Sequence, residues 1–232
     1  GELLEAQKFY KKSLENFGSP DDYLEYAKLC ISLAKNDEAL EYLNKVKGTY
    51  LKNRAIQEEA KLNLNLGKYD EAINLYKKML SGSYKDKNIA YIGIGSAYRI
   101  LGKYKEAIEW LNKALSGSDH DKIMASIELA KLYEELNDLS KSEKLLDNVI
   151  KTSKGNYGRL EYARLLIKLH NHEEAKKLLL EILFLCGNES FNKAIIQSSS
   201  EIKQLEIDGN DLKMFNIGFK ITKKRVNSQI NG

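Results

Sequence analysis

The segment that decides the fold runs from Tyr91 to Leu111 and reads YIGIGSAYRILGKYKEAIEWL. Its first half places the small residue Gly95 among larger apolar residues, and its second half places Ala107 four positions before Leu111. A Leu-Gly-Lys-Tyr turn separates the halves, and glycine favours the left-handed conformation that ends a helix. Small residues also let two helix backbones approach closely. The segment therefore predicts two antiparallel helices that cross at small side chains.

The same pattern recurs through most of the chain. A small residue followed four positions later by tyrosine or leucine returns at intervals of 33, 33, 35, 35 and 33 residues. These small residues are Ala6, Ala39, Ala72, Ala107, Ser142 and Ala175. Twelve positions before each of the last five stands another small residue: Ala27, Ala60, Gly95, Ala130 and Ala163. A fixed period of about 34 residues predicts a stack of similar two-helix units.

These residues resemble the tetratricopeptide repeat (TPR) pattern W-x2-L-G-x2-Y…A-x3-F. The matching residues of the third full repeat are Tyr91, Ile94, Gly95, Tyr98, Ala107 and Leu111, with tyrosine in place of tryptophan. The family's proline after the second helix is absent from every repeat, and three repeats replace the turn glycine, by Ala34, Asn137 and His170. The resemblance implies an all-α, right-handed superhelical solenoid of antiparallel helix pairs.

Residues 1–187 are predicted to form the TPR array. It comprises a half repeat at 3–16 and five full repeats over 21–187, which begin near Asp21, Asn53, Asn88, Asp121 and Tyr157. Residues 188–232 are predicted to form a degenerate sixth repeat or C-terminal capping helices, giving about twelve or thirteen helices in all. An uncovered half repeat exposes apolar residues, so we expect weak self-association or a longer native protein.

Composition excludes several functional classes. The net charge is only +4, which gives no reason to expect nucleic acid as a partner. No run of 18 apolar residues is present, so no membrane span is expected. Cys30 and Cys186 are far apart and are expected to be reduced thiols, which suits the cytoplasm.

No catalytic, metal or cofactor site is predicted. No serine or cysteine lies in a recognisable nucleophile motif, and no glycine-rich phosphate loop follows a strand. His170 and His172 form an H-x-H pair in a turn, which lacks the one-turn helical spacing of strong zinc motifs. We therefore expect a protein that is not an enzyme.

The resemblance implies that a partner peptide lies on the concave face, which the first helix of each repeat lines. Groove positions follow from their offset to the small residue of that helix. Three residues before it stand Leu24, Gln57, Ile92, Ile127 and Leu160, and one residue after it stand Lys28, Lys61, Ser96, Lys131 and Arg164. The predicted groove residues are Lys28, Lys61, Ile89, Ile92, Ser96, Met124, Ile127, Lys131, Tyr157, Leu160 and Arg164.

Two interpretations of the basic positions stay open. They favour a partner with apolar anchors and acidic groups, but in four repeats a glutamate stands three residues earlier on the same helix. Such pairs can be ordinary solvated ion pairs worth about 0.2–0.5 kcal/mol each. A clamp for the acidic tail of heat-shock proteins is disfavoured, because only Lys28 fits that pattern and Glu58 would repel a carboxylate.

The sequence thus predicts a protein–protein interaction scaffold that binds a peptide or partner segment in its groove. Two alternatives remain. The chain could be a peptide-sensing regulatory domain, or the TPR segment of a larger enzyme.

Overall fold

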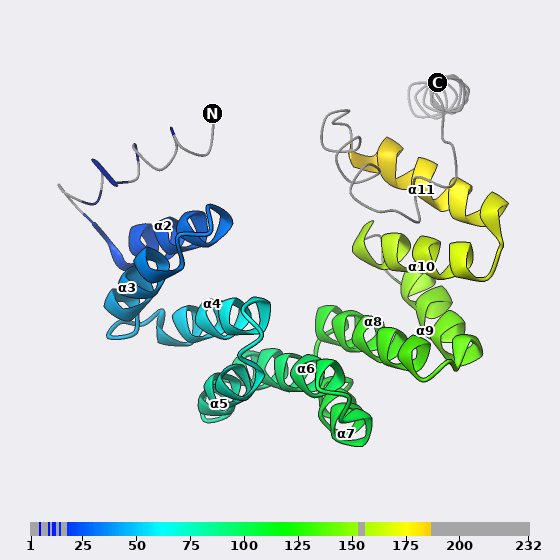
Figure 1. Cartoon of the computed structure of the whole chain (residues 1–232), viewed down its shortest axis with the longest axis horizontal. Helices are drawn as coiled ribbons and strands as arrows, with labels where there is room; N and C mark the ends of the chain where they lie inside the picture. The colour runs from blue at the N-terminus through cyan, green and yellow to red at the C-terminus, as the bar shows by residue number, and fades with distance from the viewer. Residues whose placement is uncertain are drawn as a thin grey trace, which may run out of the picture. The chain divides into compact units, whose positions relative to one another are not determined.

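The computed structural model describes residues 18–152 and 156–186, together with the single residues 5, 9, 11, 12 and 14. Within these residues the secondary structure is entirely helical, and ten helices are bounded (Figure 1). The predicted all-α fold of antiparallel helix pairs is confirmed. The further helices expected in residues 188–232 lie outside the described part of the chain.

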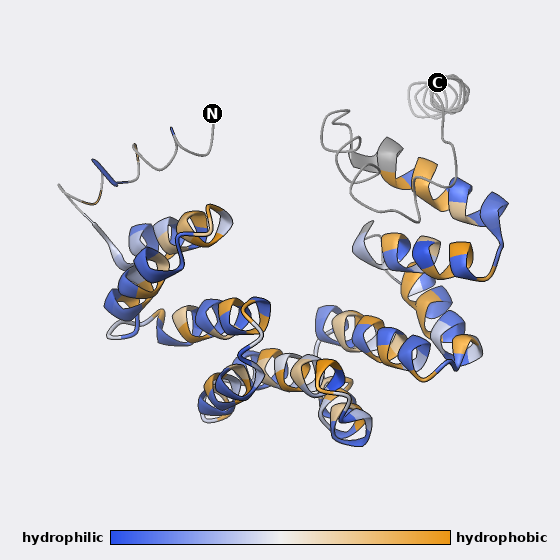
Figure 2. Ribbon diagram, viewed as in Figure 1, coloured by the Kyte–Doolittle hydropathy of each residue, from blue (hydrophilic) through white to orange (hydrophobic). Residues whose placement is uncertain are grey.

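Five helix pairs follow one another, and we call the first helix of each pair A and the second B. In chain order the A and B helices are α2 (Pro20–Ser32) and α3 (Asn36–Val46), α4 (Lys52–Asn65) and α5 (Tyr69–Met79), α6 (Tyr84–Ile100) and α7 (Tyr104–Ala114), α8 (Asp119–Glu135) and α9 (Leu139–Thr152), and α10 (Asn156–Lys168) and α11 (His172–Cys186). Consecutive A helices also touch, α2 with α4 and α4 with α6. Every helix carries both apolar and polar residues, as amphipathic helices do (Figure 2).

The small residues of the repeat lie at the helix crossings. The A-helix positions are fully buried, and this confirms the prediction for Gly95 and Ala130. A Cβ atom at Gly95 would lie 2.5 Å from Cγ of Leu111, and one at Gly93 would lie 2.3 Å from Cζ of Tyr76. Helix α6 therefore contacts α7 at Gly95 and α5 at Gly93, at distances that exclude any side chain.

The five A-to-B turns share one backbone conformation. The turn residue has a positive φ whether it is glycine or not: 57° at Ala34, 74° at Gly67, 70° at Gly102, 60° at Asn137 and 59° at His170. The next N–H donates to the carbonyl five residues back, as from Lys35 to Cys30 and from Lys103 to Tyr98, both at 2.9 Å. This bond is typical of a Schellman cap. The turn predicted from glycine is thus kept at the three replacements.

Two repeats carry a polar contact that the repeat pattern does not predict. Asn53 Nδ2 donates to Asp86 Oδ2 at 2.9 Å, and Asn88 Nδ2 donates to Asp121 Oδ2 at 3.2 Å. Each aspartate also accepts from a preceding serine, Ser83 or Ser118. These contacts lie at the N-terminal ends of α6 and α8, which are 17 residues long against 14 in α4. The two repeats with a 35-residue spacing therefore begin helix A earlier, and a hydrogen bond ties that extension to the preceding A helix.

The chain divides into two compact units within α8, after Leu132. Two clusters of the first unit show its packing: Leu24 packs with Val46 and Leu51, and Ile56 packs with Tyr76 and Ile94. In the segment predicted as a half repeat, Leu14 packs against the cluster that contains Tyr26, Cys30 and Ala39.

Candidate functional site

The basic groove positions of α2 and α4 form ion pairs within their own helices. Lys28 Nζ lies 2.7 Å from Glu25 Oε1, and Lys61 Nζ lies 2.9 Å from Glu58 Oε1. Both lysine side chains remain at least one third exposed. Each pair contributes only about 0.2–0.5 kcal/mol to its helix, but it cancels most of the local positive charge.

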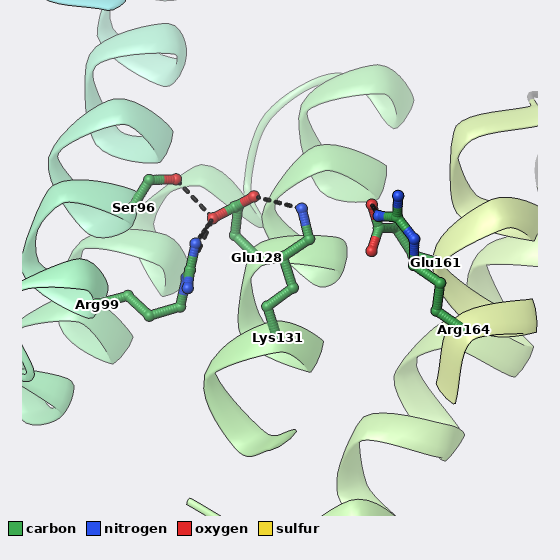
Figure 3. A network of polar contacts seen from close by, with 6 residues as sticks. All are labelled: Ser96, Arg99, Glu128, Lys131, Glu161 and Arg164. Carbon is green, nitrogen blue, oxygen red and sulfur yellow. Dashed lines mark hydrogen bonds and ion pairs between the residues drawn. The ribbon is translucent and has the colours of Figure 1, made fainter. Parts of the chain in front are cut away.

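The equivalent pair of α8 is buried and is also bonded to α6. Glu128 accepts a hydrogen bond from Ser96 Oγ at 2.7 Å and forms ion pairs with Arg99 Nη2 at 3.3 Å and Lys131 Nζ at 3.4 Å (Figure 3). Burial would raise the pKa of this carboxyl, but the charges of Lys131 and Arg99 and the bond from Ser96 outweigh it, so the pKa is lowered. Of the two predicted groove residues, Ser96 thus links α6 to α8 through Glu128, and Lys131 pairs with the same carboxylate within α8.

Helix α10 of the second unit also contains a glutamate paired with a cation of the same helix. Arg164 Nη1 donates to Glu161 Oε1 at 3.1 Å, and Glu161 is buried (Figure 3). All four glutamate–cation pairs anticipated from the sequence are therefore formed. The third repeat, which has Gly93 and Ser96 in place of glutamate and lysine, carries no such pair on its A helix.

Helix α6 instead presents an uncharged stripe. Ile89, Ile92, Ser96 and Ile100 are three or four residues apart in succession, and residues at this spacing share one face of a helix. Ile89 and Ile92 are half-buried, while Ile100 is 44% exposed. Ile100 was missed in the sequence analysis, although its position eleven residues after Ile89, close to three helical turns, was a usable signal. We call these three isoleucines with Ser96 the α6 stripe.

The remaining predicted residues are placed differently. Ile127 is fully buried, so its side chain belongs to the packed interior and offers no surface to a ligand. Met124 is half-buried on α8 in the first unit. Tyr157, Leu160 and Arg164 lie on α10 in the second unit, where Tyr157 is 43% exposed and the other two are half-buried.

Groups suited to chemistry do not converge in the described residues. No set of three histidine, cysteine or acidic side chains there could hold a metal ion, and the rings of His170 and His172 lie 6.0 Å apart. Cys30 is buried, and burial raises the pKa of its thiol, which disfavours the reactive thiolate. None of the described helices is long and apolar enough to cross a bilayer.

Comparisons with known proteins agree with this architecture. The tetratricopeptide repeat family model matches residues 58–121. No protein of curated function matches the sequence.

Several solved structures share the fold at low sequence identity. A tetratricopeptide repeat protein from Parabacteroides merdae is 16% identical, with 93% of this chain and 91% of that chain covered and a TM-score of 0.55. A thermophilic TPR protein of Thermus thermophilus is 17% identical, with 78% and 98% covered and a TM-score of 0.59. A chain of the APC/C hetero-tetramer Cut9–Hcn1 is 14% identical, with 92% and 45% covered and a TM-score of 0.61.

The recurring small residues, the five capped turns and the paired helices are the features of this chain that agree with these matches. Residues 58–121 match the tetratricopeptide repeat family, and the described helices have the fold of TPR proteins.

Proposed function

We propose that this protein is a non-catalytic interaction scaffold that binds a peptide or partner segment on the A-helix face of its middle repeats. The TPR fold suggests a scaffold for protein–protein interaction. The observation that carries the finer proposal is the α6 stripe, an apolar strip flanked by helices whose basic groove positions are paired with glutamate. Apolar anchors supply most of the binding energy in protein interfaces, and paired charges supply little.

The contact residues of this proposal are Ile89, Ile92 and Ile100 on α6, with Met124 on α8. Ile127 is left out because it is buried. Lys28, Lys61 and Lys131 would contribute a modest preference for acidic residues, since each already has a glutamate partner. Tyr157, Leu160 and Arg164 form a second candidate surface on α10. A cytoplasmic location is part of the proposal, because a buried free thiol such as Cys30 suits a reducing compartment.

The test begins with peptides selected from a random library for binding to the full chain. Affinity of a selected, labelled peptide is then measured by fluorescence anisotropy for the variant Ile92→Ser, Ile100→Ser. We expect binding to weaken about tenfold or more, because each lost anchor costs about 1 kcal/mol or more.

A matched control changes two aliphatic residues that lie outside α6. Leu66 and Leu136 are each 44% exposed, as Ile100 is, so Leu66→Ser, Leu136→Ser removes similar exposed surface. Binding by the control should stay within about twofold. If both variants remain helical and the stripe variant binds every selected peptide as the parent does, the proposed surface is wrong.

A further inference from the structure

The hydrogen bond between Asn53 and Asp86 brings two short basic segments side by side. Asn53 lies in the first turn of α4 and Asp86 in the first turn of α6. Gly82 packs directly against this bond, because a Cβ atom at Gly82 would lie 2.6 Å from Asn53 Nδ2 and 2.7 Å from Asp86 Oδ2. The segments Lys52-Asn53-Arg54 and Lys85-Asp86-Lys87 are therefore adjacent, with the hydrogen-bonded pair between them.

The Asp86 carboxylate accepts hydrogen bonds from within the protein. Its Oδ2 accepts from Asn53 Nδ2, from the Ser83 amide at 2.9 Å and from Ser83 Oγ at 2.7 Å. Burial would raise the pKa of this carboxyl, but the hydrogen bonds from Ser83 and Asn53 and the charge of Lys85 lower it. The carboxylate thus holds the two helices in place and is engaged as an acceptor.

Four cations flank the hydrogen-bonded pair: Lys52, Arg54, Lys85 and Lys87. The side chains of these four form no hydrogen bond or ion pair within the described residues, and all except the half-buried Lys87 are exposed. They differ in this from Lys28 and Lys61, whose charges are paired with glutamate. Cations in the first turn of a helix are disfavoured by the helix dipole, so helix stability does not account for them.

Two of the four share the face of the α6 stripe. Lys85 stands four residues before Ile89 and so extends the stripe by one turn. Asn53 of α4 and Asn88 of α6 hold equivalent positions, since each donates to an aspartate of the next A helix. Arg54 on α4 is therefore equivalent to Ile89 on α6 and has the same orientation. Arg54 and Lys85 therefore lie on either side of the Asn53–Asp86 bond, at the N-terminal end of the stripe.

We propose that Arg54 and Lys85 bind a carboxylate of an acidic peptide segment whose apolar residues lie on the α6 stripe. This inference rests on the proposed function and deepens it, since it assigns the larger part of the acidic preference to these two residues. An arginine can bind a carboxylate with two parallel hydrogen bonds, and a neighbouring lysine adds a point charge.

An acidic peptide fits this site better than a nucleic acid does. Asp86 lies between the cations, so the surface alternates in sign over a short distance. A phosphate backbone needs an extended basic surface to release its counterions, and the net charge of the chain is only +4. A single carboxylate next to an apolar side chain needs only one such site.

The test measures binding of a short fluorescein-labelled peptide of interspersed glutamate and leucine to the full chain by anisotropy. The variant Arg54→Gln, Lys85→Gln should bind this probe about tenfold more weakly and with a flatter dependence on salt. The control Lys28→Gln, Lys61→Gln removes the same number of positive charges from paired sites. It should change affinity less than about threefold.

Three outcomes would overturn the inference. The inference fails if the Arg54→Gln, Lys85→Gln variant remains folded and keeps the parent's affinity, or if the control loses as much. It also fails if a duplex oligonucleotide binds more tightly than the peptide and loses its binding in the same variant.

The outcome for the proposed function is read separately. If the library-selected peptides need Ile92 and Ile100 but not Arg54 and Lys85, the scaffold proposal stands and this inference fails. If the glutamate–leucine probe needs Arg54 and Lys85 but not Ile92 and Ile100, its carboxylate binds without its leucines lying on the α6 stripe. The inference then fails, because it places the apolar residues of the peptide on that stripe.

Discussion

Ala34 ends helix α2 with a φ of 57°, a conformation that an L-residue with a Cβ atom adopts at a cost. The equivalent residues of the second and third repeats are glycines, at Gly67 and Gly102. The chain keeps the turn at Ala34 because the capping bond from Lys35 to Cys30 and the packing of α2 on α3 require it. The strain is therefore local and removable.

We predict that Ala34→Gly stabilises the protein by about 0.5–1 kcal/mol. Relief of the left-handed strain is worth about 1–2 kcal/mol, and the greater flexibility of unfolded glycine offsets part of it. Urea unfolding followed by circular dichroism measures the change. The reverse substitution, Gly102→Ala, should destabilise by a similar amount, and a loss of stability in Ala34→Gly would contradict the explanation.

Individual residues also show how far the sequence could predict the site. Gly95 and the turn residues were predictable, because small or turn-forming residues recur at the same positions in most repeats. The burial of Ile127 was not, since it depends on how far α8 is rotated against its neighbours. Asn53 and Asp86 are 33 residues apart, so their contact needs the stacking geometry and not only the period.

At the scale of the elements, two buried carboxylates of α8, Asp121 and Glu128, accept hydrogen bonds from α6. Glu128 bonds to Ser96 and Arg99 of the preceding A helix and to Lys131 of its own. The corresponding glutamate of α2, Glu25, bonds only to its exposed neighbour Lys28 among the described residues. The same sequence position is therefore structural in one repeat and nearly neutral in another.

We predict that Glu128→Gln destabilises the protein by about 1–2 kcal/mol at neutral pH. Because the pKa of Glu128 is lowered in the folded state, its contribution is present above the unfolded pKa of about 4.3 and is lost as pH falls through the lower folded pKa. The variant should therefore lose less stability than the parent on acidification below about pH 4.

Unfolding free energies from urea titrations between neutral and acidic pH measure both effects. Glu25→Gln makes the same chemical change in an exposed pair and should alter stability by no more than about 0.5 kcal/mol. Parallel pH curves for the parent and Glu128→Gln would show that the carboxylate is not ionised and paired as described.

At the scale of the molecule, the described helices within each unit contact helices of the same or the adjacent repeat. Helix α4, for example, touches α2, α3, α5 and α6. A molecule built this way has a stability close to the sum of its repeats and their interfaces. A local defect should then raise opening near its own position and leave distant repeats unchanged.

This leads to a prediction for Gly95→Val, which would place methyl groups against Leu111 where a Cβ atom alone lies 2.5 Å from Cγ. The overpacking should lower the local opening free energy by about 1–3 kcal/mol. Amide hydrogen exchange measured by mass spectrometry should therefore accelerate in α5 to α8, while α2 and α11 keep the rates of the parent.

Gly48→Ala is the control, because a Cβ atom at Gly48 meets nothing within 4 Å, and its exchange should match the parent throughout. Equal acceleration in every helix of Gly95→Val would mean that the repeats open as one cooperative body, and binding at the middle repeats would then be coupled to the whole chain.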